Sequence, residues 1–204
     1  MRDVGAHDCT RYYLEGRIKT IREKIKKELK EILSEKRYRH SVNTAEKCEE
    51  LAKIYNVNIE EAYITGLLHD IAREMSKEEV AQYIENNTID VDEFEEKDKE
   101  KLLHSKIGAD IARKKYGLNE NAINAIKYHT YGHPNMDILA KIVYIGDEIE
   151  KDREYKEVEE IRFLSKENID KAVLKSLEYR VQRRLNEGRE VHPSMITTIN
   201  CLRK

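Results

Sequence analysis

A histidine and an aspartate, His69 and Asp70, stand side by side in the otherwise apolar segment GLLHDIA at residues 66–72. A lone histidine on an apolar face is more often a hydrogen-bonded core residue than a ligand. An ionised carboxylate beside it is costly, however, unless it is paired or bound to a metal. Successive helical residues point about 100° apart, so both side chains can reach one ion at the edge of a helix. The pair therefore indicates either a metal site or a buried polar network.

Histidines or carboxylates interrupt apolar helical stripes at four more positions, namely His40, His104, His129 and Asp147. One inward polar residue is a packing detail, whereas several helices that each aim one inward indicate a shared polar centre. Imidazole and carboxylate ligands without thiolates suit an octahedral divalent transition metal such as iron, manganese, cobalt or nickel better than structural zinc. A His–Asp hydrogen-bond network without a metal is the alternative.

The elements that position these residues are expected to be helices. The 204 residues include 8 Gly and 2 Pro, so few positions break a helix, and no stretch alternates with period two. Ser76 with Glu79 forms a capping-box pattern, Asn119 is a candidate N-cap, and Gly117 and Pro193 mark a helix end and a helix start. Helical periodicity predicts the segments 17–39, 37–55, 60–73, 76–87, 99–116, 119–130, 136–152 and 165–188.

Composition and charge exclude several classes of protein. The net charge of −2 makes no case for a dedicated nucleic-acid or membrane-surface protein, and no run approaches the roughly 18 apolar residues of a membrane span. Segment 17–39 carries ten Lys and Arg against four Glu, for which a solvated helix face is favoured over a nucleic-acid surface. Cys9, Cys48 and Cys201 are widely spaced without a C-x-x-C, so neither a disulfide framework nor a zinc ribbon is expected. We therefore expect a cytoplasmic protein. Residues 90–100 are strongly acidic, and we expect them to form an exposed connection between helices.

The polar positions fall within longer motifs. These are RYRHS (37–41), GLLHDIAREMSKEE (66–79), LLHSKIGA (102–109) and IKYHTYGHPNMDILAKIVYIGDEIE (126–150), followed by Arg153 and HPSMITTIN (192–200). In this order they resemble the HD-domain superfamily of metal-dependent phosphohydrolases, and more closely its YqeK-type branch, the symmetrical diadenosine tetraphosphatases of bacteria. The resemblance departs at Gly146, Glu148, Lys151 and His133, where that branch usually has Ala, Tyr, Pro and Arg.

The resemblance implies an all-α HD-domain helical bundle over residues 36–204, preceded at residues 1–35 by a tail and the basic amphipathic helix. It also implies four metal ligands, and iron is the metal we expect first among those named above. Asp70 would orient or deprotonate the attacking water. His104 and His129 would face the phosphates, hold a second metal, or protonate the departing ADP. The implied metal ligands are His40, His69, Asp70 and Asp147.

The implied reaction is the symmetrical hydrolysis of diadenosine tetraphosphate to two ADP. Arg37, Arg73 and Arg153 are expected to supply positive charge for the phosphates. Thr130 and Gly132 are expected to line the turn that holds the phosphates, and HPSMITTIN resembles the family segment that closes over the nucleoside. The residues expected to bind substrate are therefore Arg37, His40, Asp70, Arg73, His104, His129, Thr130, Asp147 and Arg153.

Three alternatives stay open at this point. The chain could be an HD phosphohydrolase for another nucleotide, either a nucleoside monophosphate or a cyclic dinucleotide. It could be a non-catalytic module that binds nucleotides or nucleic acid through its basic helix. It could also be a catalytically silent scaffold, against which the complete ligand set argues. The expected partner is a dinucleoside polyphosphate or another nucleotide. We expect neither nucleic acid nor a membrane as a partner. A homodimer is left open.

Overall fold

The computed structural model describes residues 20–204, except for the side chains of residues 98, 100 and 101. Within this range every regular element is a helix, so the expected all-α fold is confirmed, while Cys9 and most of the expected tail lie outside it. Residues 20–32 are helical. The elements that follow are α2 (Glu35–Ile54), α3 (Ile59–Leu68), α4 (Lys77–Asn86), the 3-10 helix η1 (Glu95–Asp98), α5 (Lys99–Leu102), α6 (His104–Tyr116), α7 (Glu120–Tyr128), α8 (Ile138–Ile149), α9 (Val158–Glu167), α10 (Ile169–Asn186) and α11 (Pro193–Leu202).

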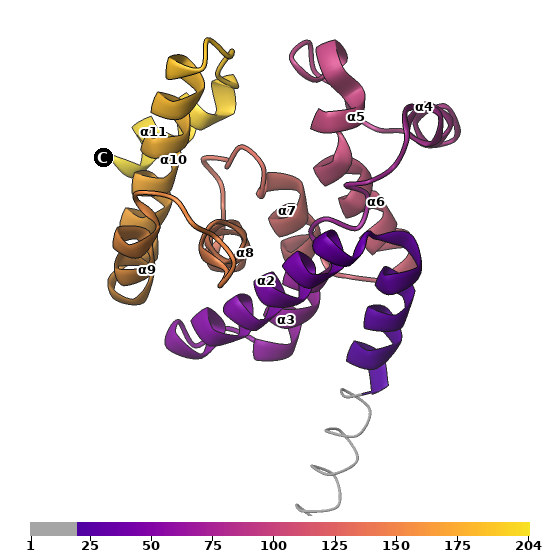
Figure 1. Cartoon of the computed structure of the whole chain (residues 1–204), viewed down its shortest axis with the longest axis horizontal. Helices are drawn as coiled ribbons and strands as arrows, with labels where there is room; N and C mark the ends of the chain where they lie inside the picture. Colours follow the sequence, from indigo (N-terminus) through magenta and orange to yellow (C-terminus); the bar gives the residue numbers. More distant parts are fainter. Residues whose placement is uncertain (1–19) are drawn as a thin grey trace, which may run out of the picture.

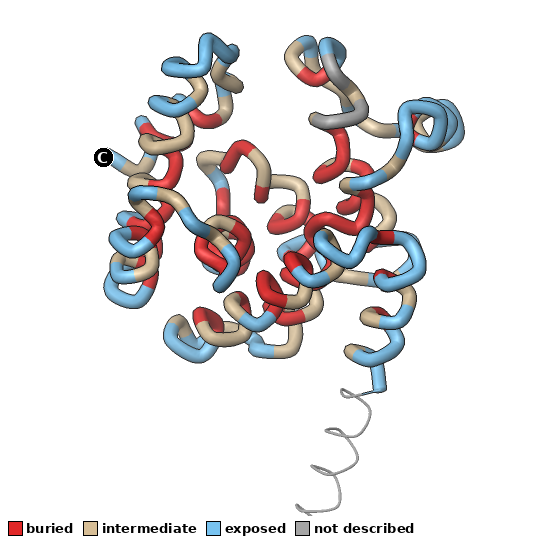
Figure 2. The backbone as a smooth tube through the Cα atoms, in the orientation of Figure 1, coloured by how far each residue is buried: buried red, intermediate tan, exposed pale blue. Residues whose placement is uncertain are grey.

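Helices α7 and α8 lie at the centre of the molecule, and α2 and α3 pack along one side of them (Figure 1). Helix α10 packs on α8, α9 and α11, and α6 packs on α7. The α9–α11 group and the α4–α6 group therefore flank the central pair on opposite sides (Figure 1). Buried residues gather where these helices face one another, and Tyr144 of α8 and Leu67 of α3 are fully buried there (Figure 2).

The structure confirms the predicted capping residues of three helices. The Ser76 side chain accepts a hydrogen bond from Glu79 N–H, and the Glu79 carboxylate accepts from Ser76 N–H, which completes the capping box of α4. Asn119 caps α7 by accepting from Ala122 N–H. Gly117 ends α6 with a φ of 64°, a left-handed conformation that glycine adopts without a Cβ clash.

The predicted helix over residues 17–39 is wrong, because the described part of it consists of two helices. The chain leaves the first helix after residue 32, and Ser34 caps α2 by accepting from Arg37 N–H. The Glu74 carboxylate fixes this break by accepting from both the N–H and the Oγ of Ser34, at 2.6 and 2.7 Å. Arg37 therefore belongs to the first turn of α2, the helix that carries His40, and not to the basic helix.

Other predicted helices also end or break earlier than expected. Segment 99–116 is divided at Leu103 into α5 and α6. Segment 60–73 is helical only to Leu68, so His69 and Asp70 lie in the turns that follow α3 and not inside a helix. Segment 165–188 is interrupted at Asn168, whose side chain accepts from the N–H of residue 171 to begin α10. Side-chain caps of this kind compete with a continuous helix. Helix α9, which precedes the break, is absent from the prediction.

The acidic segment 90–100 is more than an exposed connection. It contains η1, and Glu95 within it is only 2% exposed. The Glu95 carboxylate accepts from Asp92 N–H at 3.0 Å and from Lys106 Nζ at 2.6 Å. A buried carboxylate is tolerated when a cation and a hydrogen-bond donor compensate its lost hydration. The pairing with Lys106 therefore explains why part of this charged segment folds back onto α6.

Helices α2, α3 and α8 approach one another closely at Cys48. A Cβ added at Gly146 would lie 2.6 Å from Cys48 Sγ, and one added at Gly66 would lie 2.7 Å from the same atom. Cys48 is fully buried, so neither glycine can become a larger residue without displacing it. The two glycines thus set the spacing of the helices that carry the polar cluster.

We expect Gly146→Ala to destabilise the protein by about 1–3 kcal/mol through overpacking. Thermal unfolding should show a midpoint about 2–4 °C lower for each kcal/mol lost. In a Cys48→Ala background, the next atom that the new Cβ meets is Thr44 O at 3.5 Å. The substitution should therefore cost less in that background than alone, and equal costs in the two backgrounds would contradict this description of the packing.

Candidate metal centre

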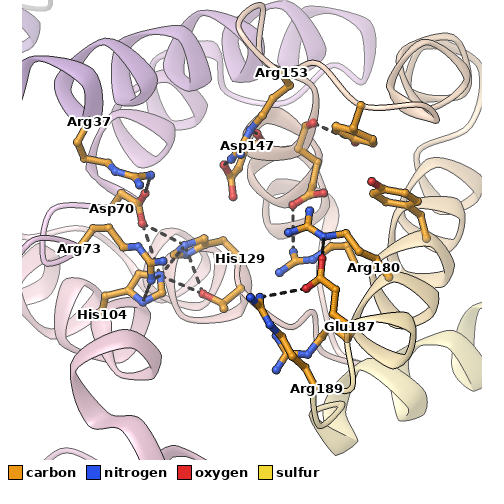
Figure 3. A pocket seen from close by; sticks show the side chains of 16 residues that line it. Arg37, Asp70, Arg73, His104, His129, Asp147, Arg153, Arg180, Glu187 and Arg189 are labelled. Atoms are coloured by element: carbon orange, nitrogen blue, oxygen red, sulfur yellow. Dashed lines mark hydrogen bonds and ion pairs between the residues drawn. The ribbon is translucent and has the colours of Figure 1, made fainter.

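Six polar residues singled out by the sequence come together in one buried cluster. They arrive from α2, the turns after α3, the start of α6, the end of α7, and α8. None is more than 9% exposed. Figure 3 shows Asp70, His104, His129 and Asp147 of this cluster around one space. The six residues are His40, His69, Asp70, His104, His129 and Asp147.

Two overlapping groups of residues have ligand atoms close enough to hold a metal ion, namely His40, His69 and Asp147, and His69, Asp70 and His129. Asp147 Oδ1 lies 3.0 Å from His40 Nε2 and 3.9 Å from His69 Nε2. Asp70 Oδ2 lies 3.8 Å from His40 Nε2 and 3.5 Å from His69 Nε2. Ligands about 2.1 Å from an ion are about 3.0 Å apart when cis in an octahedron and about 4.2 Å apart when trans. All four separations therefore suit donors to a single octahedral ion.

Two imidazoles also aim an unsatisfied nitrogen at the position of such an ion. Nε2 of His40 and Nε2 of His69 are buried and make no hydrogen bond, although carboxylate oxygens lie nearby. The carboxylate oxygens lie close to these nitrogens, but not in a direction that forms a hydrogen bond. This is expected when the nitrogens and the oxygens all point at one position between them. A buried nitrogen without a partner costs free energy, which a bound cation would restore. The residues present therefore fit a divalent metal ion.

The outer nitrogens of two imidazoles are fixed by backbone carbonyls. His69 Nδ1 lies 2.7 Å from Gly66 O, and His129 Nδ1 lies 2.7 Å from Ile126 O. A carbonyl oxygen only accepts, so Nδ1 carries the proton in both rings and Nε2 presents its lone pair to the centre. Such outer hydrogen bonds are the usual means by which proteins orient a metal-binding histidine.

His40 is oriented by a carboxylate that the sequence reasoning missed. His40 Nδ1 lies 3.2 Å from Glu150 Oε1, and Asn43 Nδ2 donates to Glu150 Oε2 at 3.0 Å. Glu150 is 2% exposed. Its position three residues after Asp147 on an otherwise apolar helix was the available signal, because that spacing places both on one helical face.

Both central carboxylates are held in their ionised form. Burial alone would raise the pKa of Asp70, but the imidazoles around it hold that pKa well below its usual range. Burial would also raise the pKa of Asp147, and the Arg153 guanidinium with the nearby imidazoles outweighs it. Arg37 Nη1 donates to Asp70 Oδ2 at 2.7 Å, and Arg153 Nη2 pairs with Asp147 Oδ1. Both oxygens are therefore anionic at neutral pH, as metal binding requires.

His40, by contrast, is protonated at neutral pH when no metal is bound. Burial alone would lower its pKa, but the Asp147 and Glu150 carboxylates beside the ring outweigh burial and raise the pKa from 6.5 to about 9. Nε2 can bind a cation only after this proton leaves. Metal uptake should therefore compete with protonation of His40 below about pH 9.

We expect Mn²⁺ binding at pH 7 to release about one proton per ion from His40. Calorimetric titrations in buffers of different ionisation enthalpy count these protons, and the count should fall as the pH rises through 9. Because the folded-state pKa is raised, the stabilisation from His40 in metal-free protein is complete below pH 6.5 and disappears above about pH 9. No proton release at pH 7 would contradict the role given to His40.

His104 lies between Arg73 and the centre of the cluster. Arg73 Nη1 lies 2.9 Å from His104 Nδ1 and 3.5 Å from His104 Nε2, so the guanidinium lies against the ring. His104 Nε2 lies 3.3 Å from His129 Nε2, 3.2 Å from Thr130 Oγ1 and 3.5 Å from Asp70 Oδ1. His104 therefore directs Nε2 at the centre, where it can exchange a proton with a bound group.

The cluster opens into a cavity of about 310 Å³. Arg37, Arg73, Thr130 and Arg153, all expected at the site, line this cavity together with Asp70, His104, His129 and Asp147. The opposite wall comes from α10 and the loops beside it (Figure 3), which the sequence reasoning missed. That wall includes Tyr155, Tyr179, Arg180, Arg183, Arg184, Glu187 and Arg189.

Gly132 and the segment 192–200 do not line this cavity. They contribute instead to a second cavity of about 420 Å³, whose lining includes Gly132, His192 and Ser194. Ser194 Oγ donates to Gly132 O at 2.7 Å, and His192 caps α11 with Pro193 in its first turn. Gly132 therefore lies beside the second cavity, and its expected part in the turn that holds the phosphates stays a prediction.

The HD domain family model matches residues 37–152. The symmetrical bis(5'-nucleosyl)-tetraphosphatase of Halalkalibacterium halodurans is 32% identical over 171 residues, which cover 83% of this chain and 90% of the relative. The enzyme of the same name from Bacillus subtilis is 30% identical over 175 residues, which cover 85% of this chain and 93% of the relative.

None of the helices described is long and apolar enough to cross a membrane.

A solved structure agrees with these matches. It is a predicted HD superfamily hydrolase involved in NAD metabolism from Clostridium acetobutylicum, and it is 37% identical in sequence. The superposition covers 89% of this chain and 97% of that one, with a TM-score of 0.84. Both the sequence and the arrangement of the helices are thus similar to those of known proteins.

Proposed function

The chain belongs to the HD-domain family, and from that premise we propose that it is a symmetrical bis(5'-nucleosyl)-tetraphosphatase. The reaction is the metal-dependent hydrolysis of diadenosine tetraphosphate to two ADP. The observation that carries this proposal is the buried cluster of four imidazoles and two carboxylates that opens into an arginine-lined cavity. Relatives that carry this enzyme name are 30–32% identical over most of the chain.

The proposed metal ligands are His40, His69, Asp70 and Asp147. A divalent ion held there would supply an activated water and polarise a phosphoryl oxygen. Nitrogen and carboxylate donors without a thiolate suit iron, manganese, cobalt or nickel, and we propose iron as the natural metal. All of these donors come from one chain, so the site requires no residue from a second copy.

The remaining steps fall to the protein's own side chains. Asp70 is anionic, and its oxygens face both the His40–His69 side and the His104–His129 side of the cluster, so it is the group best placed to accept a proton from the attacking water. His104, whose ring lies against Arg73 and whose Nε2 faces Asp70, is the proposed proton donor to the departing ADP.

Positive charge next to the centre comes from two arginines. Arg37 pairs with Asp70 and Arg153 pairs with Asp147, so each guanidinium lies next to a proposed metal ligand on the cavity wall. Arginine suits this position because its planar fork can bind phosphate oxygens through two parallel hydrogen bonds. We propose that both arginines turn towards the phosphates when substrate enters.

The basic helix at residues 20–32 is a weaker candidate for a functional surface than the cluster and its cavity. Arg22, within residues 20–32, pairs with Glu60 at 2.5 Å and with Glu49 at 3.2 Å, and its guanidinium lies over the Tyr63 ring. This face of the helix is therefore engaged in packing against α2 and α3. A nucleic-acid module would show strongly salt-dependent binding that survives His69→Ala.

Product analysis tests the proposed function. Metal-loaded protein is incubated with diadenosine tetraphosphate, and the products are separated by anion-exchange chromatography. ADP as the sole product supports the proposal. ATP with AMP in equal amounts would show asymmetrical cleavage, and turnover of nucleoside monophosphates or cyclic dinucleotides alone would assign the site to another substrate.

We propose that the enzyme acts in the cytoplasm.

A further inference from the structure

One face of α10 turns a row of arginines towards the cavity. Arg180, Arg183 and Arg184 have the i, i+3, i+4 spacing of a single helical face, and Arg189 follows just beyond the helix end. All four line the same cavity as Asp70. Figure 3 shows Arg180 and Arg189 on the wall that faces Asp70, His104 and His129. We call these four residues the α10 arginine row.

The ordinary electrostatics of a helix end does not account for the whole row. Cations in the last turn of a helix interact favourably with its dipole, which would explain Arg183 and Arg184. Arg180 lies one turn earlier, and its side chain is 23% exposed where it pairs with Glu148 at 3.0 Å. Arg189 lies beyond the helix. What the four share is the cavity and not the helix terminus.

The charges that line the cavity are not balanced. Seven arginines and four carboxylates line the cavity. Each carboxylate pairs with one of the arginines, so an excess of positive charge remains on the wall. Glu187 pairs with both Arg183 and Arg189, and Arg184 Nε donates to the neutral carbonyl of Glu190 at 2.6 Å. An excess of guanidinium in a concave site attracts a polyanion, and Arg is the side chain best suited to phosphate oxygens.

We infer that the α10 arginine row binds the phosphates of the ADP that departs, and that it thereby selects a four-phosphate bridge over a shorter one. The inference rests on the proposed function, because it takes the attacked phosphorus to lie at the His–Asp cluster. The phosphates beyond the broken bond then extend across the cavity towards α10. A substrate with fewer phosphates beyond that bond makes fewer contacts with the row.

Glu187 makes the inference testable in both directions. Its carboxylate oxygens lie 3.0 Å from Arg183 Nε and 3.2 Å from Arg189 Nη1, so it competes with phosphate for both guanidinium groups. Neutralising it with Glu187→Gln should tighten the binding of a polyphosphate and lower KM. A row that served only to stabilise the helix end would instead lose stability with no change in KM.

The central experiment compares Arg184→Gln, Arg189→Gln and the double variant with a matched control, Arg203→Gln. Arg189 is 61% exposed and pairs with Glu187, and Arg203 is 58% exposed and pairs with Glu178. Arg203 does not line the cavity. Thermal unfolding of each variant separates loss of binding from loss of fold.

The double variant should lower kcat/KM for diadenosine tetraphosphate about tenfold or more, mainly through KM, since each arginine supplies charge-assisted hydrogen bonds to phosphate oxygens. The loss on diadenosine triphosphate should be clearly smaller. Arg203→Gln should change neither value. Equal losses on the two substrates, or no loss beyond that of Arg203→Gln, would overturn the inference while leaving the proposed function in place.

A binding measurement keeps the two proposals separable. If the wild type does not cleave the tetraphosphate, the proposed function fails, and calorimetric binding of ADP to the metal-free protein then decides the inference. Weaker ADP binding by the double variant than by Arg203→Gln supports the arginine row as a phosphate site. Equal ADP affinities in the two variants would overturn it.

Discussion

The Asp70→Asn variant should hydrolyse diadenosine tetraphosphate at least about a thousandfold more slowly than the wild type. One Asp70 oxygen lies beside His40 and His69, and the other beside His104 and His129. An amide cannot take a proton from water, and general-base catalysis alone contributes about 10²–10⁴-fold. The amide also removes the negative charge that a proposed metal ligand provides.

The measurement is kcat with metal-saturated protein, and circular dichroism shows whether the helices persist. Asp110→Asn is the matched control, because Asp110 is also a well-covered carboxylate, with its side chain 18% exposed, and it pairs with Lys114 far from the cluster. The control should keep wild-type kcat. Activity undiminished in Asp70→Asn would remove Asp70 from the mechanism.

The His69→Ala variant should lose both its bound metal and its turnover. The imidazole is fully buried, and its Nε2 points at the centre without a hydrogen-bond partner. Loss of an outer hydrogen-bond partner of a ligand costs roughly 10–100-fold in metal affinity, so loss of the ligand itself should cost more. Metal content of the folded fraction, isolated by gel filtration, measures the effect apart from any loss of stability.

Two further variants should lose less metal than His69→Ala. Glu150→Gln weakens the support of His40 without removing a proposed ligand, so its loss of metal affinity should fall within the roughly 10–100-fold range of an outer partner. His133→Ala removes an imidazole that stacks on Tyr128 and lines the second cavity, and it should retain metal. If His69→Ala and His133→Ala bound metal equally well, the cluster would not be a metal site.

The convergence of the polar residues could be predicted because each one interrupts an apolar helical stripe. Burial of that stripe carries the polar residue inward, so His40, His104 and Asp147 had to meet near the core once an all-α fold was accepted. The residues around them also supplied a family resemblance, and the family match over residues 37–152 agrees with it.

What could not be predicted depends on contacts between distant segments. Ser34 ends a helix because Glu74, forty residues later, accepts its hydrogen bonds, and helical periodicity carries no trace of that pairing. The α10 arginines look like an ordinary solvated helix end until α10 is placed opposite the cluster. Glu148, which departs from the family's usual tyrosine, pairs there with Arg180.

Anomalous diffraction from crystals soaked in Mn²⁺ shows directly whether the cluster holds a metal ion. We expect one strong peak about 2.0–2.2 Å from His40 Nε2, His69 Nε2, an Asp70 oxygen and an Asp147 oxygen, and no such peak in crystals of His69→Ala. A peak bound elsewhere, or a wild-type cluster that stays without anomalous density at saturating Mn²⁺, would contradict the proposed metal site.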